Sequence, residues 1–244
     1  MSNLAIVFTV LSVLFAVVFM VIRVKKAPIY GLLSKTFASM VFVAMGVVGV
    51  LEGYNFSLGV KLLPFGAALI PLGLAYGMVG DIVLDLKRAH SEHEEKYLWS
   101  GMTAFILGHI VYLAAVILSA KDMGITDIWL PAVVSAAIAV LVTPVVMILA
   151  VRVMKANFGK FFGISAFYAA FLVFFSAFTL WLTILDKRFL LLNMGMIAFL
   201  LSDLVLCPMY FVEGKKEDKL LVVVNHSLYY GAQILIAAWL FVIV

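Results

Sequence analysis

Charged residues are scarce in this chain of 244 residues. Asp, Glu, Lys and Arg together make up 12% of it, while 66% of the residues are hydrophobic. A soluble domain of this length cannot hide so much apolar surface, whereas a stack of spans of about 20 apolar residues places that surface against lipid. The scarcity of charge therefore excludes a soluble enzyme. It predicts a polytopic helical membrane protein with a single integral membrane domain over residues 1–244.

Three further absences narrow the class of protein. The lone cysteine, Cys207, excludes an intrachain disulfide. The apolar runs are continuous rather than short and alternating, which excludes an outer-membrane barrel. The sequence has no phosphate-binding Gly-rich loop, no G-x-S-x-G elbow and no H-E-x-x-H zinc pattern. ATP-driven transport, serine-lipase chemistry and zinc hydrolysis therefore lack support, and we expect neither a metal nor another cofactor.

What the chain does have is eight apolar runs that are long enough to cross a bilayer. They predict an all-α bundle of eight transmembrane helices, with the polar loop Glu52–Gly59 between the second and the third. The spans cover approximately Asn3–Ile22, Tyr30–Val50, Val60–Leu86, Tyr97–Ser119, Trp129–Val151, Phe161–Ile184, Phe189–Val212 and Leu220–Val244.

Basic residues are concentrated in alternate loops, and the net charge of +4 reflects this arrangement rather than a nucleic-acid partner. Four of the seven loops between spans hold three Lys or Arg residues each, and the remaining three loops hold only Lys61, Lys121 and the pair Lys187 and Arg188. Because basic loops stay on the cytoplasmic side, both termini are predicted on the non-cytoplasmic side, of the plasma or inner membrane if the source is bacterial. The four basic loops carry Arg23, Lys25 and Lys26; Lys87, Arg88 and Lys96; Arg152, Lys155 and Lys160; and Lys215, Lys216 and Lys219.

Two aspartates interrupt the apolar spans, Asp81 in the third and Asp203 in the seventh. An ionisable side chain inside a membrane is costly, so each indicates a functional site. Gly73-x-x-x-Gly77 precedes Asp81 and allows neighbouring helices to approach closely. Asp85, one helical turn beyond Asp81, is expected to be interfacial and solvated. The alternative interpretation of both aspartates is a structural ion pair or an interhelical hydrogen bond.

Other polar residues are predicted to share the cytoplasmic leaflet with these aspartates. Lys35 lies early in the second span, and His109 lies near the middle of the fourth. Either residue also has a structural interpretation, because a lysine near a span end can snorkel to the interface and a histidine can be part of the core. The first half of the last span adds Asn225, Tyr229, Tyr230 and Gln233.

A weak internal repeat relates the two halves of the chain. The segment GDIVL around Asp81 matches SDLVL around Asp203, and His109-x-x-Tyr112 matches His226-x-x-Tyr229. The four spans of each half would then be parallel repeats about an axis along the membrane normal, as in some transporters. On this hypothesis the two aspartates face each other near the axis.

These residues resemble the lysoplasmalogenase family, also called YhhN-like, over nearly the whole chain. Thr36 departs from the family pattern, which commonly has a proline after the lysine. The resemblance is carried by Lys35, by Gly80-Asp81 with Leu84, by Gly108-His109 and Tyr112, by Ser202-Asp203, and by the run from Tyr229 through Tyr230 to Gln233.

The resemblance implies an enzyme that hydrolyses the vinyl-ether bond of lysoplasmalogens, taking its lysophospholipid substrate from the cytoplasmic leaflet among other membrane lipids. Such chemistry needs a proton donor and a carboxylate that stabilises a cation or activates water, as in glycosidases by analogy. We expect Asp81 and Asp203 in these roles, with the acid not assigned, and His109 as a proton shuttle or orienting group. The expected substrate-binding residues are Lys35, Tyr112, Asn225, Tyr229, Tyr230 and Gln233.

Several alternatives stay open. Lys35 either pairs with an aspartate or reaches the substrate phosphate. Buried Asp, Lys and His residues also serve proton relays, so a proton-coupled small-molecule transporter or a lipid-translocating protein is the alternative function. The sequence leaves the oligomeric state undecided, since Gly49-x-x-x-Gly53 suits internal packing and dimerisation equally.

Overall fold

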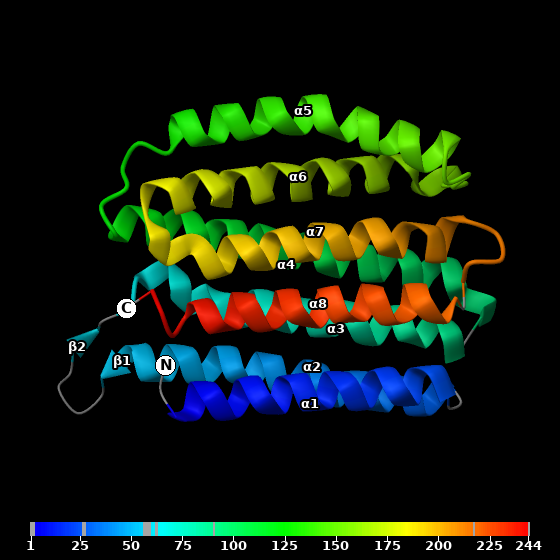
Figure 1. The fold of residues 1–244 in the computed structure, drawn as a ribbon, viewed down its shortest axis with the longest axis horizontal. Helices are drawn as coiled ribbons and strands as arrows, with labels where there is room; N and C mark the ends of the chain where they lie inside the picture. Colours follow the sequence, from blue (N-terminus) through cyan, green and yellow to red (C-terminus); the bar gives the residue numbers. More distant parts are fainter. Residues whose placement is uncertain are drawn as a thin grey trace. The chain divides into compact units, whose positions relative to one another are not determined.

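The computed structural model describes residues 3–25, 28–55, 60–61, 63–89, 91–216 and 218–243. In this part of the chain eight helices are long and apolar enough to cross a membrane, which confirms the all-α polytopic class (Figure 1). The long helices are α1 (Asn3–Lys25), α2 (Pro28–Gly53), α3 (Ile70–Ala89), α4 (Glu94–Asp122), α5 (Trp129–Arg152), α6 (Phe162–Leu185), α7 (Leu190–Phe211) and α8 (Lys219–Trp239).

Contacts within the chain divide it into two compact units. Unit 1 comprises Met1–Thr126 together with Gln233–Val244, and unit 2 comprises Asp127–Ala232. Unit 1 therefore holds α1 to α4 and the last part of α8, and unit 2 holds α5 to α7 and the first part of α8. The prediction of a single membrane domain stays a prediction.

The start of the third span differs from the sequence expectation. Val60–Lys61 form a short strand, β2, that pairs antiparallel with β1 (Tyr54–Asn55). The membrane-spanning segment begins with the 3₁₀ helix η1 (Phe65–Leu69), which leads into α3. Pro64, which precedes η1, has an extended backbone conformation with φ −54° and ψ 139°. Its ring restricts φ, and it has no N–H group to donate to a helix.

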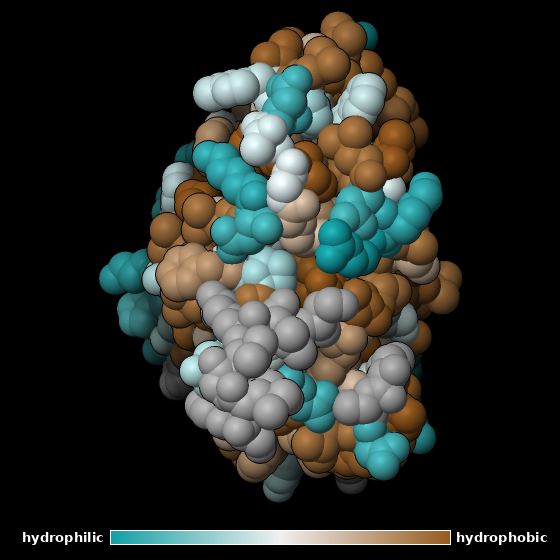
Figure 2. Space-filling model, turned by 90° about the vertical axis from the view of Figure 1, so that its left-hand side faces the viewer, coloured by the Kyte–Doolittle hydropathy of each residue, from teal (hydrophilic) through white to brown (hydrophobic). Residues whose placement is uncertain are grey.

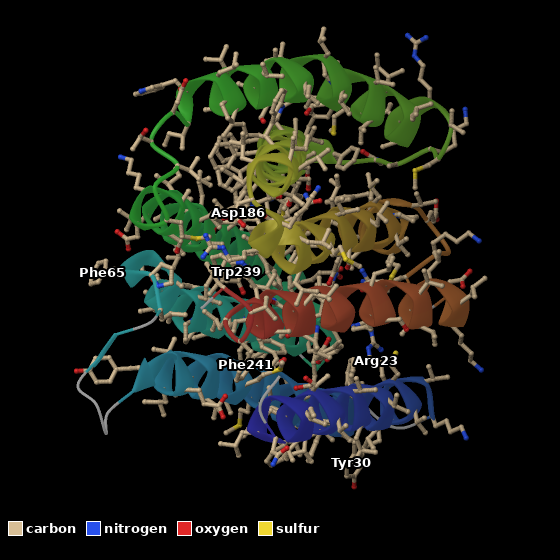
Figure 3. The ribbon with its side chains drawn as sticks, turned by 60° about the vertical axis from the view of Figure 1, so that its left-hand side comes forward. Arg23, Tyr30, Phe65, Asp186, Trp239 and Phe241 are labelled. Carbon is tan, nitrogen blue, oxygen red and sulfur yellow. The ribbon has the colours of Figure 1, made fainter. Side chains whose placement is uncertain are left out.

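Helix ends differ from the predicted spans in other places as well. α1 runs through Arg23 to Lys25, whereas Lys26 lies outside the described residues. α4 includes Asp122, whose carboxylate accepts a hydrogen bond of 2.6 Å from the backbone N–H of Phe65. This bond caps η1 from the neighbouring helix, while the Phe65 ring points away from the helices (Figure 3). α8 ends at Trp239 instead of continuing to the C-terminus.

Close contact between α3 and α4 depends on glycine. A Cβ atom at Gly73 would overlap the ring of Tyr112, and one at Gly108 would lie 3.2 Å from the Gly73 carbonyl oxygen. The predicted close approach at Gly73 is confirmed. The missing side chains let Tyr112 lie flat against α3, and this fixes where its hydroxyl group ends.

Unit 2 has a polar contact between α6 and α7 in its core. The Asn193 side-chain amide donates to the Ser176 carbonyl and to Thr179 Oγ1, both at 3.0 Å. At the end of α6, Asp186 accepts hydrogen bonds from the backbone N–H and the guanidinium of Arg188, the shortest at 2.7 Å. The side-chain hydrogen bonds from Arg188 are the main reason that the pKa of Asp186 lies below its ordinary value.

The exposed flanks of the long helices are apolar. In α5, Val140 and Leu141 are each 72% exposed, and other large aliphatic side chains along the helix are also exposed. A view toward the helix ends, by contrast, shows hydrophilic side chains among hydrophobic ones (Figure 2). Apolar flanks with polar ends are the pattern of helices that span a bilayer.

Candidate functional site

Asp81 lies at the centre of a buried polar cluster in unit 1. It is 2% exposed and is held by two residues of α2. Lys35 Nζ lies 3.1 Å from Asp81 Oδ1, and the Ser39 hydroxyl donates a hydrogen bond of 2.6 Å to Oδ2. A nearby ammonium and a hydroxyl donor both favour the ionised carboxylate. The cluster therefore places an ammonium group and a hydroxyl donor on the two oxygens of one buried carboxyl group.

Asp85 belongs to the same cluster, so the expectation that it is solvated is wrong. It is 6% exposed, and its Oδ1 lies 3.7 Å from Lys35 Nζ. The reason is helical geometry. Asp81 and Asp85 are four residues apart on α3 and share one face, which is turned toward α2.

Lys35 does not snorkel to the surface. It is 5% exposed, it pairs with both carboxylates, and its ammonium lies 6.0 Å from the centre of the Phe19 ring. Pairing with an aspartate was one of the two alternatives for this residue, and the structure has this pairing. Binding of the substrate phosphate by Lys35 stays a prediction.

Tyr112 and Gln233 form a second polar contact in unit 1. The Tyr112 hydroxyl donates a hydrogen bond of 2.9 Å to Gln233 Oε1, and both side chains are fully buried. His109, one turn before Tyr112, is 1% exposed, and its Nδ1 lies 2.8 Å from the Phe105 carbonyl. The structure thus places five of the predicted site residues in unit 1: Lys35, Asp81, His109, Tyr112 and Gln233.

Asp203 belongs to unit 2 and has a different environment. Its side chain is half-buried, and Tyr168 of α6 lies within interaction range of the carboxyl group. Among the residues that the structure describes, no lysine or arginine forms an ion pair with Asp203, and its buried Oδ2 has no hydrogen-bond partner. The two aspartates that resemble each other in sequence therefore differ in charge environment.

The other predicted residues of unit 2 are engaged in packing around α8. Asn225 donates to the Ser202 carbonyl at 2.8 Å and to Ser202 Oγ at 3.0 Å, which ties α8 to α7. The Tyr229 ring meets the rings of Phe199 and Tyr230 edge-on, with centroids 5.5 and 5.2 Å apart. Substrate binding by Asn225, Tyr229 and Tyr230 stays a prediction.

The proposed internal repeat has a local counterpart in the two histidines. His226 Nδ1 lies 2.7 Å from the Val222 carbonyl, four residues earlier, just as His109 lies against Phe105. Each histidine is buried and fixed by its own helix. This likeness is local, and the parallel repeat itself stays a prediction.

Two members of the cluster were not identified from the sequence. The residue type of Ser39 does not indicate a functional site, because serine is common in membrane helices. Its spacing was informative, since Ser39 is four residues after Lys35 and so lies on the same face of α2. Asp85 is predicted from the sequence to be a solvated residue at the interface, and therefore not a member of the site.

A family model described as the YhhN family matches residues 33–240. This range begins within α2 and ends just after α8, and it includes the predicted site residues from Lys35 to Gln233. No curated protein and no solved structure matches the chain.

Proposed function

The chain belongs to the YhhN family, and from this membership we propose that it hydrolyses the vinyl-ether bond of lysoplasmalogens. The products are a fatty aldehyde and glycerophosphocholine or glycerophosphoethanolamine. The observation that best supports the proposal is the buried carboxylate of Asp81 with its two donors, Lys35 at 3.1 Å and Ser39 at 2.6 Å.

The reaction consumes one water molecule and involves no redox step. A carboxylic acid protonates the alkene carbon that is farther from the ether oxygen, which leaves an oxocarbenium ion. A carboxylate stabilises this cation and takes a proton from the attacking water, so that a hemiacetal forms. When the hemiacetal collapses, the bond between its carbon and the glycerol oxygen breaks. The hydroxyl group becomes the aldehyde carbonyl, and the glycerol oxygen takes up a proton. The chemistry needs one acid and one base.

We assign the base to Asp81 and the acid to Asp203. Lys35 and Ser39 compensate a negative charge at Asp81, and such a carboxylate suits the stabilisation of an oxocarbenium ion. Asp203 has no ionic partner among the described residues, and a carboxyl group with an unpaired buried oxygen is less costly in its neutral form. The mechanism requires both groups at one substrate.

The remaining roles concern the substrate, a lysophospholipid that enters from the cytoplasmic leaflet. Tyr112 and Gln233 form a polar pair near Asp81 and are proposed to bind water or the head group. His109 is proposed to orient the acid–base residues. Asn225, Tyr229 and Tyr230 are proposed to line the path of the substrate.

The test is aldehyde release from a synthetic lysoplasmalogen by the purified protein in detergent, with Asp81→Asn and Asp203→Asn measured alongside. We expect release by the wild type and a loss of at least about a thousandfold in each variant, because catalytic carboxylates carry several kcal/mol of transition-state stabilisation.

Asp127→Asn provides the matched control, because Asp127 is exposed in the loop between α4 and α5. This variant should retain wild-type turnover. A folded but inert wild-type protein would contradict vinyl-ether hydrolysis. Proton-coupled uptake into liposomes would then be the reaction to measure.

A further inference from the structure

Asp85 and Asp81 share one ammonium group, although each is buried. Lys35 Nζ is closer to Asp81, at 3.1 Å, than to Asp85, at 3.7 Å. A buried carboxylate is costly unless cations or hydrogen-bond donors compensate its charge. A cation of another helix at the depth of Asp85 would therefore stabilise the cluster.

Arg23 of α1 is a buried cation on the correct face of its helix. It is 8% exposed and lies on the inner side of α1 (Figure 3). The buried residues Ala16, Phe19 and Arg23 are three and four apart, so they form one face of the helix. Phe19 on this face lies over the ammonium of Lys35. The face that carries Arg23 therefore covers the ion-pair cluster.

The register of the helices places Arg23 at the depth of Asp85. α1 and α3 run in the same direction (Figure 1), so a step of four residues moves about 6 Å the same way in both. Phe19 and Asp81 both contact Lys35. Arg23 is four residues beyond Phe19, and Asp85 is four residues beyond Asp81, so both lie one turn farther toward the same helix ends.

Other charged and titratable groups also lie in unit 1 near the cluster. Lys87, which is also buried, forms an ion pair of 3.2 Å with Glu94 of α4. The buried titratable groups that α4 adds near the cluster are His109 and Tyr112, and neither supplies a fixed positive charge. Among the residues that the structure describes, Arg23 is a cation whose helix, face and depth match Asp85.

We propose that Arg23 pairs with Asp85 and thereby reserves Lys35 for Asp81. Arg23 is then a positioning residue that acts on the base through two ion pairs. It precedes residues 33–240, so on this proposal α1 contributes to the site from outside the range that the family model matches. The effect on turnover rests on the proposed function, whereas the ion pair itself does not.

A double-mutant cycle on the full-length protein in detergent tests the pairing. The variants are Arg23→Met, Asp85→Asn, their combination, and Arg23→Lys as the conservative change. We expect each neutralising single variant to lower kcat for aldehyde release about tenfold with KM unchanged. In Arg23→Met, Asp85 competes with Asp81 for Lys35, and in Asp85→Asn the guanidinium of Arg23, released from Asp85, competes with Lys35 for Asp81. The double variant and Arg23→Lys should stay within about threefold of the wild type.

Lys25→Met is the matched control, since Lys25 is an exposed cation at the same end of α1. It should leave kcat unchanged. The thermal midpoint of unfolding gives a second readout that needs no substrate, and the double variant should lose less than the sum of the two single losses.

The outcomes separate the ion pair from the reaction. Additive losses of thermal midpoint would overturn the pairing, whatever the turnover. Non-additive losses in a protein that releases no aldehyde would support the pairing and count against vinyl-ether hydrolysis alone. If Arg23→Met does not fold, a folded double variant supports the pairing and an unfolded one overturns it.

Discussion

Ser39 contacts the carboxylate of Asp81 through a hydrogen bond of 2.6 Å, and its hydroxyl group offers a sharp test at the scale of single side chains. A hydrogen bond to a charged group contributes about 1.5–3 kcal/mol. We therefore expect Ser39→Ala to lower kcat for aldehyde release at least about tenfold, because the base would lose the hydrogen bond from the Ser39 hydroxyl. Steady-state kinetics of the purified variant checks this prediction.

Ser34→Ala is the control for this change. Ser34 is on the same helix, and its hydroxyl donates to the carbonyl groups of Tyr30 and Gly31 within that helix. Its removal should leave kcat unchanged. Equal losses in both serine variants would mean that Ser39 acts through helix stability and not through Asp81.

Residue types inside a span predicted part of the cluster. Asp81 stood out because a carboxylate in an apolar run is rare, and Lys35 stood out for the same reason. Asp85 was misplaced because the span was expected to end at Leu86, whereas α3 continues to Ala89 with Lys35 beside it. Partners across helices depend on packing, which a single sequence does not show.

At the scale of helices, the contact between α3 and α4 predicts a specific sensitivity. Gly73→Ala should displace the ring of Tyr112 and break its hydrogen bond to Gln233. Overpacking of a tight interface costs about 1–3 kcal/mol of unfolding free energy, so the thermal midpoint in detergent should fall by several degrees.

Gly163→Ala is the comparison for this variant. A Cβ atom at Gly163 in α6 would meet nothing within 4 Å. Because alanine favours a helix by about 1 kcal/mol over glycine, this change should keep or raise the midpoint. A midpoint that is equally insensitive to Gly73→Ala would show that the α3–α4 contact tolerates a wider spacing.

Helix number was predictable because apolar runs of the length of a bilayer are unambiguous. The ends of the third span were not, because the apolar residues around Pro64 read as one continuous run. The backbone conformation around Pro64 determines where the helical part of this span begins. The proline holds the chain extended, and the preceding residues form the short β1–β2 pair instead of a helix.

At the scale of the whole molecule, the loop charges predict which ends of the helices face the cytoplasm. Single cysteines at Asp127 and at Glu213, in a Cys207→Ser background, test this orientation because both positions are exposed. A membrane-impermeant maleimide applied to intact cells should label Asp127→Cys. Glu213→Cys should be labelled only after permeabilisation.

The reverse labelling pattern would place the basic loops outside and would remove the cytoplasmic leaflet as the source of substrate. Labelling at both positions in intact cells would indicate leaky cells, and a cytoplasmic marker protein controls for that. The orientation rests on charge bias alone, so it is independent of the proposed chemistry.

The path of α8 has a consequence for how this chain could have arisen and how it could be divided. Its first part belongs to unit 2, while Gln233 and the residues after it belong to unit 1, where Gln233 receives the hydrogen bond from Tyr112. A gene fragment that stops in the loop between α4 and α5 therefore encodes an incomplete first unit. The chain can be compared with a hypothetical ancestor of four helices that was later duplicated. In such an ancestor, the residues that complete unit 1 would have had to come from the last helix of a second copy of the chain.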